Sequence, residues 1–274
     1  MPELPEVEVT RRGIARQVEG RELERAVLRT PALRYPIPDG LAQQLAGRSL
    51  LATRRRGKYL LLDFGTGHLL IHLGMSGSLR FVAPATPPGK HDHADFVFGT
   101  DGKDGILRLT DPRRFGALLW LKGDPLAHPL LAKLGIEPLS PDFTPAWLHA
   151  ALQGKSVAIK PAIMDGGRVV GVGNIYAAES LFDAGIDPRR PAGRVSFARL
   201  ERLVPAIKAT LRAAIRAGGS TLRDFCNTSG GMGDFQTRHK IYDRAGEACI
   251  RCGTPIRLIR QGQRSTCFCP RCQR

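Results

Sequence analysis

Apolar residues recur at three- and four-residue steps along the first part of the chain. Val7, Ile14 and Val18 keep this spacing, and a proline and an acidic residue, Pro2 and Glu3, stand ahead of them. Proline and acidic side chains are typical of the start of a helix, where backbone N–H groups have no partner inside the helix. The pattern predicts an amphipathic helix that begins almost at the first residue.

Between about residues 23 and 121 the pattern changes to short apolar runs separated by glycine, proline and aspartate. Turns are expected at Gly65-Thr66-Gly67 and at Asp101-Gly102. The predicted strands are Leu60–Phe64, Leu69–Leu73, Leu79–Val82, Phe96–Phe98, Ile106–Leu109 and Leu118–Leu121. Several short strands at this spacing predict an antiparallel sandwich or barrel.

Prolines crowd together from Pro125 to Pro145, which is typical of a linker between domains, and we place this linker at residues 135–146. Helical spacing returns beyond it. The predicted helices are Trp147–Leu152, Asn174–Ala184 and Ala198–Ala217. Gly218-Gly219 ends the last of them, and the glycine-rich stretch 220–237 predicts a mobile loop.

The charge of the chain suggests a class of partner. With 274 residues and 42% hydrophobic content, the chain can bury a substantial core, but 41 Lys+Arg against 25 Asp+Glu give a net charge of +16. Folding does not require that excess, so it indicates a polyanion, either nucleic acid or an anionic membrane. The apolar runs are shorter than the roughly 18 residues that cross a bilayer, and no basic and then apolar signal sequence is present. We therefore expect a cytoplasmic protein that binds nucleic acid and no membrane.

Four cysteines near the end of the chain have the spacing of a zinc site. Cys249 and Cys252 form one C-x-x-C pair, Cys269 and Cys272 form another, and sixteen residues separate the pairs. Four thiolates complete a tetrahedron around zinc, whereas disulfides are disfavoured in a reducing cytoplasm. We predict one structural zinc ion. Cys267 leaves a second register open, in which it replaces Cys269 in a poorer C-x4-C pair.

The segment that carries these cysteines is strongly basic. From residue 238 to residue 274, nine lysines and arginines stand against two acidic residues, and the net charge is about +5 once four thiolates and one zinc ion are counted. Arg257, Arg260 and Arg264 lie between the two cysteine pairs, where a β-hairpin would project them. A solvated basic face on a purely structural finger is the alternative, but so many cations on a small element favour phosphate binding.

A second candidate phosphate site is the segment Gly171-Val172-Gly173-Asn174-Ile175-Tyr176, which opens a predicted helix. Free N–H groups at a helix start attract anions. The third glycine of a dinucleotide fingerprint is absent, so we expect no nucleotide cofactor. An ordinary turn capped by Asn174 is the alternative, while nearby Lys155 and Lys160 favour phosphate.

Pro2 admits two interpretations. It is either an ordinary helix-starting residue, with Glu3 and Glu6 complementing the helix dipole, or a reagent. If Met1 is removed, the free secondary amine of Pro2 can attack an electrophilic carbon and form an iminium, as lysine does in Schiff-base enzymes. If Met1 is retained, the same nitrogen is an unreactive amide. The sequence leaves the removal of Met1 open.

The motifs, taken together, resemble the formamidopyrimidine-DNA glycosylase family of bacterial 8-oxoguanine repair enzymes. The likeness spans the whole chain, and its most specific parts are residues 1–8 with Arg11-Arg12-Gly13 and the four-cysteine segment. The other matching motifs are Arg56-Gly57-Lys58-Tyr59-Leu60, Leu73-Gly74-Met75-Ser76-Gly77, Lys90-His91-Asp92-His93, Asp111-Pro112-Arg113-Arg114-Phe115-Gly116 and Val172-Gly173-Asn174-Ile175-Tyr176. The departures, Val9 and the extra Cys267, do not touch the groups expected to react.

The resemblance implies catalytic roles for five residues. Pro2 is implied to attack the sugar of an extruded damaged nucleotide and to hold it as a Schiff base. Glu3 is implied as the proton donor with Glu6 in support, and Lys58 as a catalytic group near the sugar and phosphate, although it could be a surface cation. Arg264 matches an arginine placed at the lesion phosphates, where a guanidinium that stays protonated stabilises the leaving phosphate.

The resemblance also implies DNA contacts. Met75, Arg113 and Phe115 look like the residues that fill the vacated hole, with Arg113 reading the orphan cytosine. The alternatives are that Met75 and Phe115 belong to the core and that Arg113 is a solvated turn residue. Three further residues resemble positions that contact DNA phosphate, and one lies on the loop expected to close over the extruded base. These are His91, Lys155 and Asn174 for phosphate and Arg223 for the loop.

The expected fold is α+β, with an N-terminal helix plus antiparallel β-sandwich (1–134), the linker (135–146), a helix-two-turn-helix domain with a lesion-capping loop (147–237) and the zinc finger (238–274). The expected function is a bifunctional glycosylase and AP lyase of base excision repair. It would excise 8-oxoguanine and formamidopyrimidines from damaged duplex DNA through Pro2 and β,δ-elimination, as a monomer in the bacterial cytoplasm at the nucleoid. The rivals are an endonuclease VIII type enzyme that prefers oxidised pyrimidines and a non-catalytic zinc-dependent DNA binder.

Overall fold

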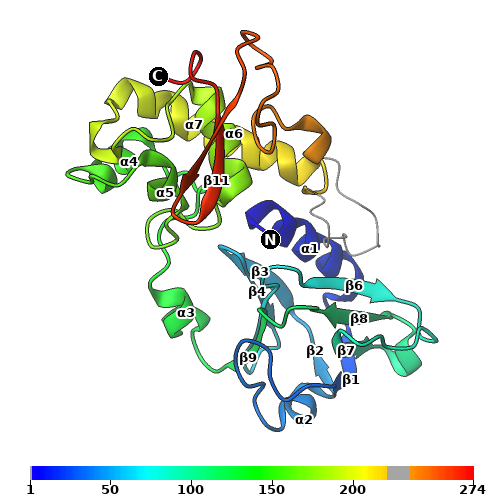
Figure 1. Ribbon diagram of the computed structural model, residues 1–274. Helices are drawn as coiled ribbons and strands as arrows, with labels where there is room; N and C mark the ends of the chain where they lie inside the picture. Colours follow the sequence, from blue (N-terminus) through cyan, green and yellow to red (C-terminus); the bar gives the residue numbers. More distant parts are fainter. Residues whose placement is uncertain (1, 221–234) are drawn as a thin grey trace. The chain divides into compact units, whose positions relative to one another are not determined.

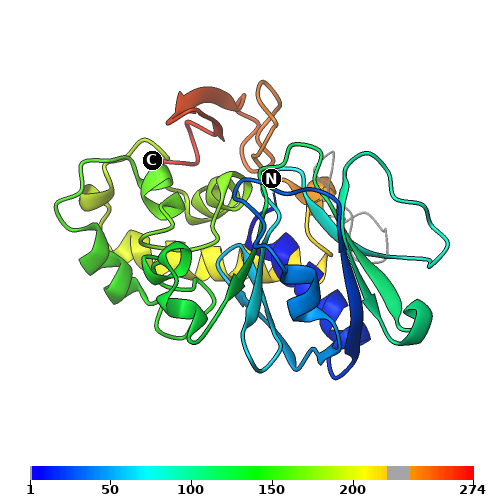
Figure 2. The same ribbon diagram turned by 90° about the horizontal axis from the view of Figure 1, so that it is seen from below.

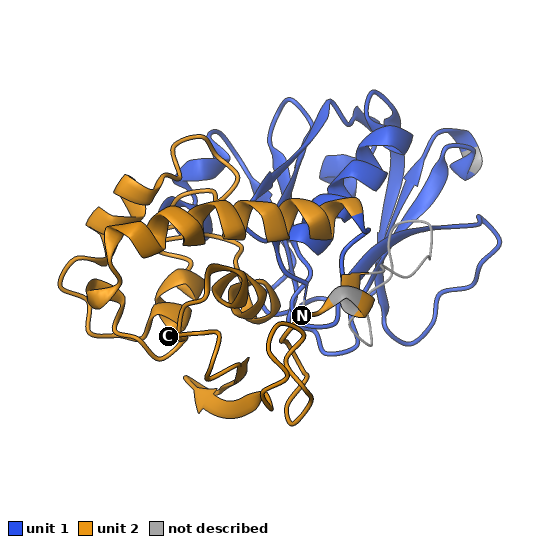
Figure 3. Ribbon diagram, turned by 90° about the horizontal axis from the view of Figure 1, so that it is seen from above, with its two compact units in different colours: residues 1–132, 217–234 blue, residues 133–216, 235–274 orange. Residues whose placement is uncertain are grey.

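The computed structural model describes residues 2–220 and 235–274 and divides the chain into two compact units, which Figure 3 colours separately. Unit 1 comprises Met1–Ala132 and Ala217–Asp234, and unit 2 comprises Lys133–Arg216 and Phe235–Arg274. The expected linker, residues 135–146, lies within unit 2. Ile136 forms an isolated bridge with Val169, and Phe143 is fully buried, so this segment is packed into unit 2.

Unit 1 opens with helix α1 (Leu4–Val18), as its apolar spacing predicted. Glu3 precedes the helix in an extended conformation, and the Glu6 carboxylate accepts a hydrogen bond from the Glu3 backbone N–H at 2.8 Å. This bond satisfies a backbone donor that has no partner inside the helix. Ile14 and Val18 are fully buried, so the apolar face of α1 joins the core of unit 1.

Two antiparallel sheets follow, and all of their strands except β5 are labelled in Figure 1. The first sheet contains, in spatial order, β2 (Arg48–Ser49), β1 (Glu22–Leu28), β7 (Asp92–Phe98), β8 (Gly105–Thr110) and β6 (Ser78–Val82). The second contains β3 (Ala52–Arg56), β4 (Tyr59–Asp63), β5 (His68–His72) and β9 (Ala117–Leu121). The shorter elements of this unit are α2 (Leu41–Leu45), η1 (Thr100–Gly102), η2 (Pro125–Ala127) and α3 (Pro129–Ala132).

The core of unit 1 lies between these two sheets. Leu60 of β4 and Leu69 of β5 come from one sheet, and Phe96 of β7 and Leu107 of β8 come from the other; all four are fully buried in one cluster. The two-residue period of strand side chains directs alternate positions toward this cluster. The predicted antiparallel sandwich is therefore confirmed, as are the six predicted strands.

Strands β1, β2 and β3 were missed by the sequence pattern. Strand β3 carries Arg54, Arg55 and Arg56 in succession, and only Thr53 of its five residues is buried. It is a strand because all five of its residues pair in register with β4. The sequence of β3 shows no alternation of apolar and polar residues, so pairing with β4 and not local composition decides its conformation.

Unit 2 is helical except for one hairpin. Its helices are α4 (Pro145–Leu152), α5 (Ile159–Met164), α6 (Asn174–Ala184), η3 (Ala192–Arg194), α7 (Phe197–Arg216) and η4 (Phe235–Arg238). Figure 2 shows the long helix α7 in yellow. Leu203, Ile207 and Leu211 on one face of α7 are fully buried, as the helical spacing predicted. The α+β class and the helical second part are confirmed.

The hairpin of unit 2 joins β10 (Arg257–Gln261) to β11 (Arg264–Phe268) through Gly262 and Gln263. Both turn residues have positive φ, 51° and 66°, which is the geometry of a tight two-residue hairpin turn. This is the hairpin expected between the cysteine pairs.

The predicted mobile loop 220–237 needs one correction. Residues 235–238 form the 3₁₀-helix η4, and Phe235 is buried, so the end of the expected loop, residues 235–237, is part of an ordered element. Residues 221–234, including Arg223, lie outside the described residues. Across 2–220 and 235–274, no helix combines the length and apolar character needed to cross a membrane.

Candidate functional site

The residues that begin the chain are held at the entrance to α1 by one buried carboxylate. Pro2 and Glu3 are buried directly ahead of the helix, and Glu6 is fully buried. The Glu6 Oε2 atom accepts from the Glu3 N–H at 2.8 Å, and its Oε1 atom accepts from the Ser220 N–H at 2.8 Å. Each carboxylate oxygen thus fixes a different backbone segment of unit 1.

The third acid of the opening motif has a different environment. Glu8 contacts Arg11 and Arg12 on its own helix and Arg55 on β3. Burial raises the pKa of the Glu8 carboxyl, but hydrogen bonds and charge from these arginines outweigh burial and lower the pKa to about 2. Glu8 is therefore an ionised tie between α1 and the second sheet.

Lys58 lies in the two-residue turn between β3 and β4. Gly57 precedes it with φ +57°, and Arg56 pairs with Tyr59 across the turn, so the hairpin projects the lysine from the end of the sheet. Tyr59 in turn pairs with His72, and their rings lie 4.8 Å apart. The predicted catalytic lysine therefore belongs to the same end of the sheet as His72.

His72 is a neutral imidazole at neutral pH. Its burial, together with the charges of Lys58 and Arg34, lowers its pKa to about 4. The His72 Nδ1 atom accepts the Gly74 backbone N–H at 3.1 Å, which leaves Nε2 as the protonated nitrogen. His72 thus presents a hydrogen-bond donor in the field of the Lys58 and Arg34 side chains.

The loops that carry Met75 and Phe115 touch each other directly. A Cβ atom at Gly74 would lie 2.5 Å from the carbonyl carbon of Phe115, so only glycine permits this approach. Asp111, 1% exposed, connects both loops. Its carboxylate accepts from the Ser76 hydroxyl at 3.3 Å and from the Gly116 N–H at 2.8 Å.

Arg113 and Phe115 project from the turn that Asp111 organises. Phe115 is 45% exposed, and the Arg113 guanidinium lies over its ring, 4.8 Å from the centroid. Phe115 is therefore not part of the core, which removes the core alternative for this residue. Met75 is half-buried and lines a cavity of about 430 Å³ together with Phe115, Arg34, His72 and Gly74.

The remaining predicted DNA contacts are on separate loops. His91 is exposed immediately before β7, and Lys155 is exposed between α4 and α5. Arg223 lies outside the described residues. Exposed positions of this kind are available to a phosphate backbone, and in the described structure His91 belongs to unit 1 and Lys155 to unit 2.

Asn174 and the finger hairpin meet within unit 2. The N-cap of α6 is Gly173, and the Asn174 side chain donates instead to the Ser265 carbonyl at 3.1 Å. The capping alternative for Asn174 is therefore wrong. Lys160 donates to the Asn174 Oδ1 atom at 2.6 Å, and Arg264, which precedes Ser265 on β11, is exposed.

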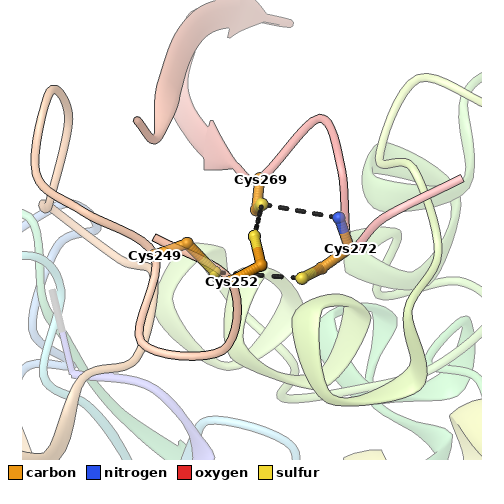
Figure 4. Close-up of side chains that lie close together, drawn as sticks. All are labelled: Cys249, Cys252, Cys269 and Cys272. Atoms are coloured by element: carbon orange, nitrogen blue, oxygen red, sulfur yellow. Dashed lines mark hydrogen bonds between the residues drawn. The ribbon is translucent and has the colours of Figure 1, made fainter. Parts of the chain in front are cut away.

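The four predicted zinc ligands converge in one cluster (Figure 4). The four Sγ atoms lie within 4.8 Å of one another, with Cys252 and Cys269 3.5 Å apart and Cys249 and Cys272 3.9 Å apart. Four convergent thiolates fit a tetrahedral zinc ion. Cys267 is buried beside this cluster but is not one of its members, so the alternative register is wrong.

The cysteine cluster is anchored on the C-terminal end of α6. Arg251 donates to the Phe182 carbonyl at 2.9 Å, lies over the Phe182 ring and pairs with Asp183 at 3.0 Å. Glu179 accepts the backbone N–H groups of residues 240, 241 and 242 at 2.8–3.0 Å, which fixes the chain as it enters the finger. The finger and α6 therefore form one packed assembly inside unit 2.

Comparison with known proteins gives this arrangement a family. Three family models match in chain order: the formamidopyrimidine-DNA glycosylase N-terminal domain over residues 1–118, its H2TH domain over 134–226, and the zinc finger found in FPG and IleRS over 246–274. A Burkholderia cenocepacia protein named formamidopyrimidine-DNA glycosylase is 57% identical over 279 aligned residues and all of both chains. The chain belongs to the formamidopyrimidine-DNA glycosylase family.

Other members of the formamidopyrimidine-DNA glycosylase family agree over the full length. An Aromatoleum aromaticum relative is 58% identical over 274 residues and all of both chains. The crystal structure of the Thermus thermophilus MutM (FPG) protein is similar with a TM-score of 0.88 at 38% identity, covering 99% of this chain and 98% of that one. The Lactococcus lactis FPG protein in complex with DNA containing an abasic site gives a TM-score of 0.90 at 33% identity, covering 99% of each chain. The expected family, fold class and single structural zinc ion are confirmed.

Sequence reasoning missed three residues that the formamidopyrimidine-DNA glycosylase structure brings into contact with predicted ones. Asp111 was quoted only as part of a matching motif and His72 was not singled out, because their roles depend on contacts with loops far away in the chain. Lys160 was noticed only as a nearby cation, yet it is 1% exposed and bonded to Asn174. A lysine within an apolar run, Ile159-Lys160-Pro161-Ala162-Ile163, was the available signal.

Proposed function

We propose that this chain is a bifunctional DNA glycosylase and AP lyase that excises oxidised purines from damaged duplex DNA. The observation that carries the proposal is the buried pair Pro2 and Glu3 directly ahead of α1, with the Glu3 N–H bonded to Glu6, in a member of this family. Relatives in the family have been crystallised with DNA containing an abasic site and with DNA containing Fapy-dG, which supports duplex DNA with a damaged purine as the substrate.

The first chemical step uses the nitrogen of Pro2 after removal of Met1. The damaged nucleotide leaves the base stack because its sugar carbon cannot be reached inside the duplex. The nitrogen bonds to C1′ as the bond from C1′ to the base breaks, the departing base takes up the proton that the Pro2 nitrogen loses, and Glu3 supplies a proton to the ring oxygen as the sugar ring opens. The product is an iminium between Pro2 and the opened sugar.

Two eliminations then remove the sugar. A proton leaves C2′ and the bond from C3′ to its phosphate oxygen breaks; a second proton loss allows the bond from C5′ to its phosphate oxygen to break. Water then hydrolyses the iminium, which frees Pro2 and the sugar fragment, and the result is a one-nucleoside gap with phosphate ends. Lys58 and Arg264 stabilise the negative charge of the departing phosphates. Arg264 acts through electrostatics alone, because a guanidinium stays protonated and does not serve as an acid.

The remaining predicted residues bind the DNA. Met75 and Phe115 occupy the space left by the extruded nucleotide, and Arg113 pairs with the orphan cytosine. Three further residues contact the phosphate backbone and a fourth lies on the loop over the extruded base; these are His91, Lys155 and Asn174, with Arg223 on the loop. One duplex needs only one such protein, so we propose that it acts as a monomer, in the cytoplasm at the nucleoid.

Borohydride trapping tests the central step. The protein with Met1 removed, verified by intact mass, should form a covalent adduct with a duplex containing 8-oxoguanine, and acylation of the N-terminal nitrogen should abolish the adduct. Full activity of protein that still carries Met1 would overturn the Pro2 mechanism. A protein that binds the duplex but never cuts it would be the non-catalytic binder instead.

A panel of lesions separates this proposal from an endonuclease VIII type activity. We expect faster excision of 8-oxoguanine and formamidopyrimidines opposite cytosine than of oxidised pyrimidines. The reverse order would assign the chain to pyrimidine repair. The tested duplexes should differ only at the lesion, because salt-dependent phosphate contacts dominate affinity and must be held constant.

A further inference from the structure

Lys160 is a buried lysine that donates hydrogen bonds to three uncharged oxygens. Its side chain is 1% exposed, and its Nζ atom lies 2.6 Å from Asn174 Oδ1, 2.7 Å from Thr266 Oγ1 and 3.2 Å from the Ser265 carbonyl oxygen. An ammonium has three N–H donors, and all three of these oxygens are acceptors for them. Burial of a charge is costly unless such bonds are made, so this arrangement fixes all three partners.

The contact with Lys160 sets the orientation of the Asn174 amide. A donor at 2.6 Å requires the Asn174 oxygen to face Lys160, so the amide nitrogen faces the other way. One N–H of that nitrogen bonds to the Ser265 carbonyl at 3.1 Å, and no partner for the other is present among residues 2–220 and 235–274. The second N–H is therefore presented as a donor.

The same ammonium fixes the strand that carries Arg264. Ser265 and Thr266 directly follow Arg264 on β11, and Lys160 bonds to both. A cavity of about 170 Å³ lies here, lined by Lys160 and Arg264 among others. One buried group thus sets the positions of two side chains that come from α6 and from the finger hairpin.

We propose that Lys160 is a positioning residue for a single phosphate site formed by Asn174 and Arg264. This inference rests on the proposed function, because the occupant is a phosphodiester of the bound DNA. At 1% exposure Lys160 does not reach the phosphate itself. It acts by holding the Asn174 nitrogen outward and by keeping β11, and with it Arg264, at a fixed distance from α6.

A double-mutant cycle tests the coupling between Lys160 and Asn174. The probe is a duplex with a tetrahydrofuran abasic analogue, which full-length, zinc-loaded protein binds without cutting. K160M and N174A are each expected to weaken binding about tenfold to a hundredfold, the range for hydrogen bonds to charged groups. Because Lys160 also holds β11 and Arg264, the double variant should bind more weakly than N174A, but its loss should be smaller than the product of the two single losses. Losses that multiply in the double variant would overturn the inference.

K208M is the matched control. Lys208 of α7 also anchors a loop, through a 2.9 Å bond to the Ser140 carbonyl, but it does not touch Asn174 or β11. The same substitution there should leave affinity for the duplex unchanged. An equal loss in K208M would show that removing any anchoring lysine of unit 2 is enough, and the specific role of Lys160 would be refuted.

T266V replaces K160M if that variant does not hold zinc or melts early. It deletes the hydroxyl acceptor of Lys160 and leaves the ammonium in place. About a threefold loss of affinity is expected when Asn174 is present, and a smaller loss in the N174A background. Equal losses in both backgrounds would contradict the coupling.

N174D tests the orientation of the amide. Aspartate keeps the acceptor for Lys160 but puts an oxygen where the outward nitrogen lies, so it should bind the duplex more weakly than N174A. Affinity equal to or above that of N174A would refute the outward donor. A wild type that forms no borohydride adduct would instead refute the proposed function, whatever these variants do.

Discussion

The Glu6 carboxylate accepts a hydrogen bond from the Ser220 backbone N–H at 2.8 Å, although the two residues are 214 positions apart in the chain. Its other oxygen holds the Glu3 N–H. One buried carboxylate therefore connects the start of α1 to the residue that precedes the segment 221–234. The residues proposed to react and the segment proposed to close over the base share this tie.

E6Q should destabilise unit 1 by about 1–3 kcal/mol. A glutamine has only one acceptor oxygen, so its NH₂ group would face either the Glu3 or the Ser220 N–H. Chemical denaturation measures the stability, and borohydride trapping measures the rate at which the adduct forms, which should fall. Wild-type stability together with wild-type trapping would contradict the role of Glu6 as a tie.

G219A should be more damaging than G20A. Both glycines have φ near +80°, where alanine costs about 1–2 kcal/mol. A Cβ at Gly20 meets nothing within 4 Å, whereas one at Gly219 lies 3.1 Å from Glu6 Oε1. Two hydrogen bonds hold Glu6 in place, so it cannot easily move away from the new Cβ atom. We therefore expect G219A to lower the free energy of unfolding by about 1 kcal/mol more than G20A does, measured by urea unfolding. Equal losses in both variants would contradict this contact.

D111N should disturb the loops of Met75 and Phe115 together. Asparagine keeps one acceptor oxygen but places an NH₂ group against the Gly116 N–H or the Ser76 hydroxyl, at a cost of about 2 kcal/mol. Preference for cytosine opposite the lesion should decrease, because Arg113 is on the same turn. D124N is the control: Asp124 is exposed and caps only Leu126, and it should change stability by less than about 0.5 kcal/mol.

The stability of the protein should fall in acid through His72. The pKa of His72 is about 4 in the folded protein, below its ordinary value of 6.5. Between these pH values the unfolded chain binds a proton at His72 and the folded chain does not. The stability that the protein gains by keeping His72 neutral is fully present above pH 6.5, and it is lost progressively as the pH falls toward 4. Relative to H72Q, the wild type should lose on the order of 2 kcal/mol across this window. If the free energy of unfolding of the wild type and of H72Q changes with pH in parallel, His72 does not cause the loss of stability in acid.

C252S and C267S distinguish the zinc ligands from the fifth cysteine. Cys252 belongs to the cluster of four thiols and Cys267 does not. C252S should lose the metal, the finger fold and affinity for DNA, because a structural zinc ion contributes about 10–16 kcal/mol to folding of such modules. C267S should retain one zinc ion per chain by elemental analysis. Unit 1 should stay folded in both variants by its thermal transition, and zinc loss in C267S would restore the alternative register.

Much of the fold was predictable from local pattern. Helix α6 (Asn174–Ala184) has the predicted bounds, and α7 (Phe197–Arg216) differs from its predicted range by one residue at each end, because helical spacing of buried positions leaves little choice of period. The arginine-rich strand β3 could not be predicted, since its pairing partner decides its conformation. The four cysteines were predictable because a metal ion requires ligands of one type at fixed spacing.

The sequence by itself determined which chemical groups the protein has: a proline at position 2 followed by acids, a basic excess, four thiols and their spacing. Only the tertiary structure decided which groups act together. The contacts of Glu6 with Ser220 and of Asp111 with Ser76 join residues that are distant in the chain. Lys160 with Thr266 is a third such pair. The reason is physical: a buried charge needs several partners at about 3 Å, and packing of whole elements, rather than local spacing, brings those partners within reach.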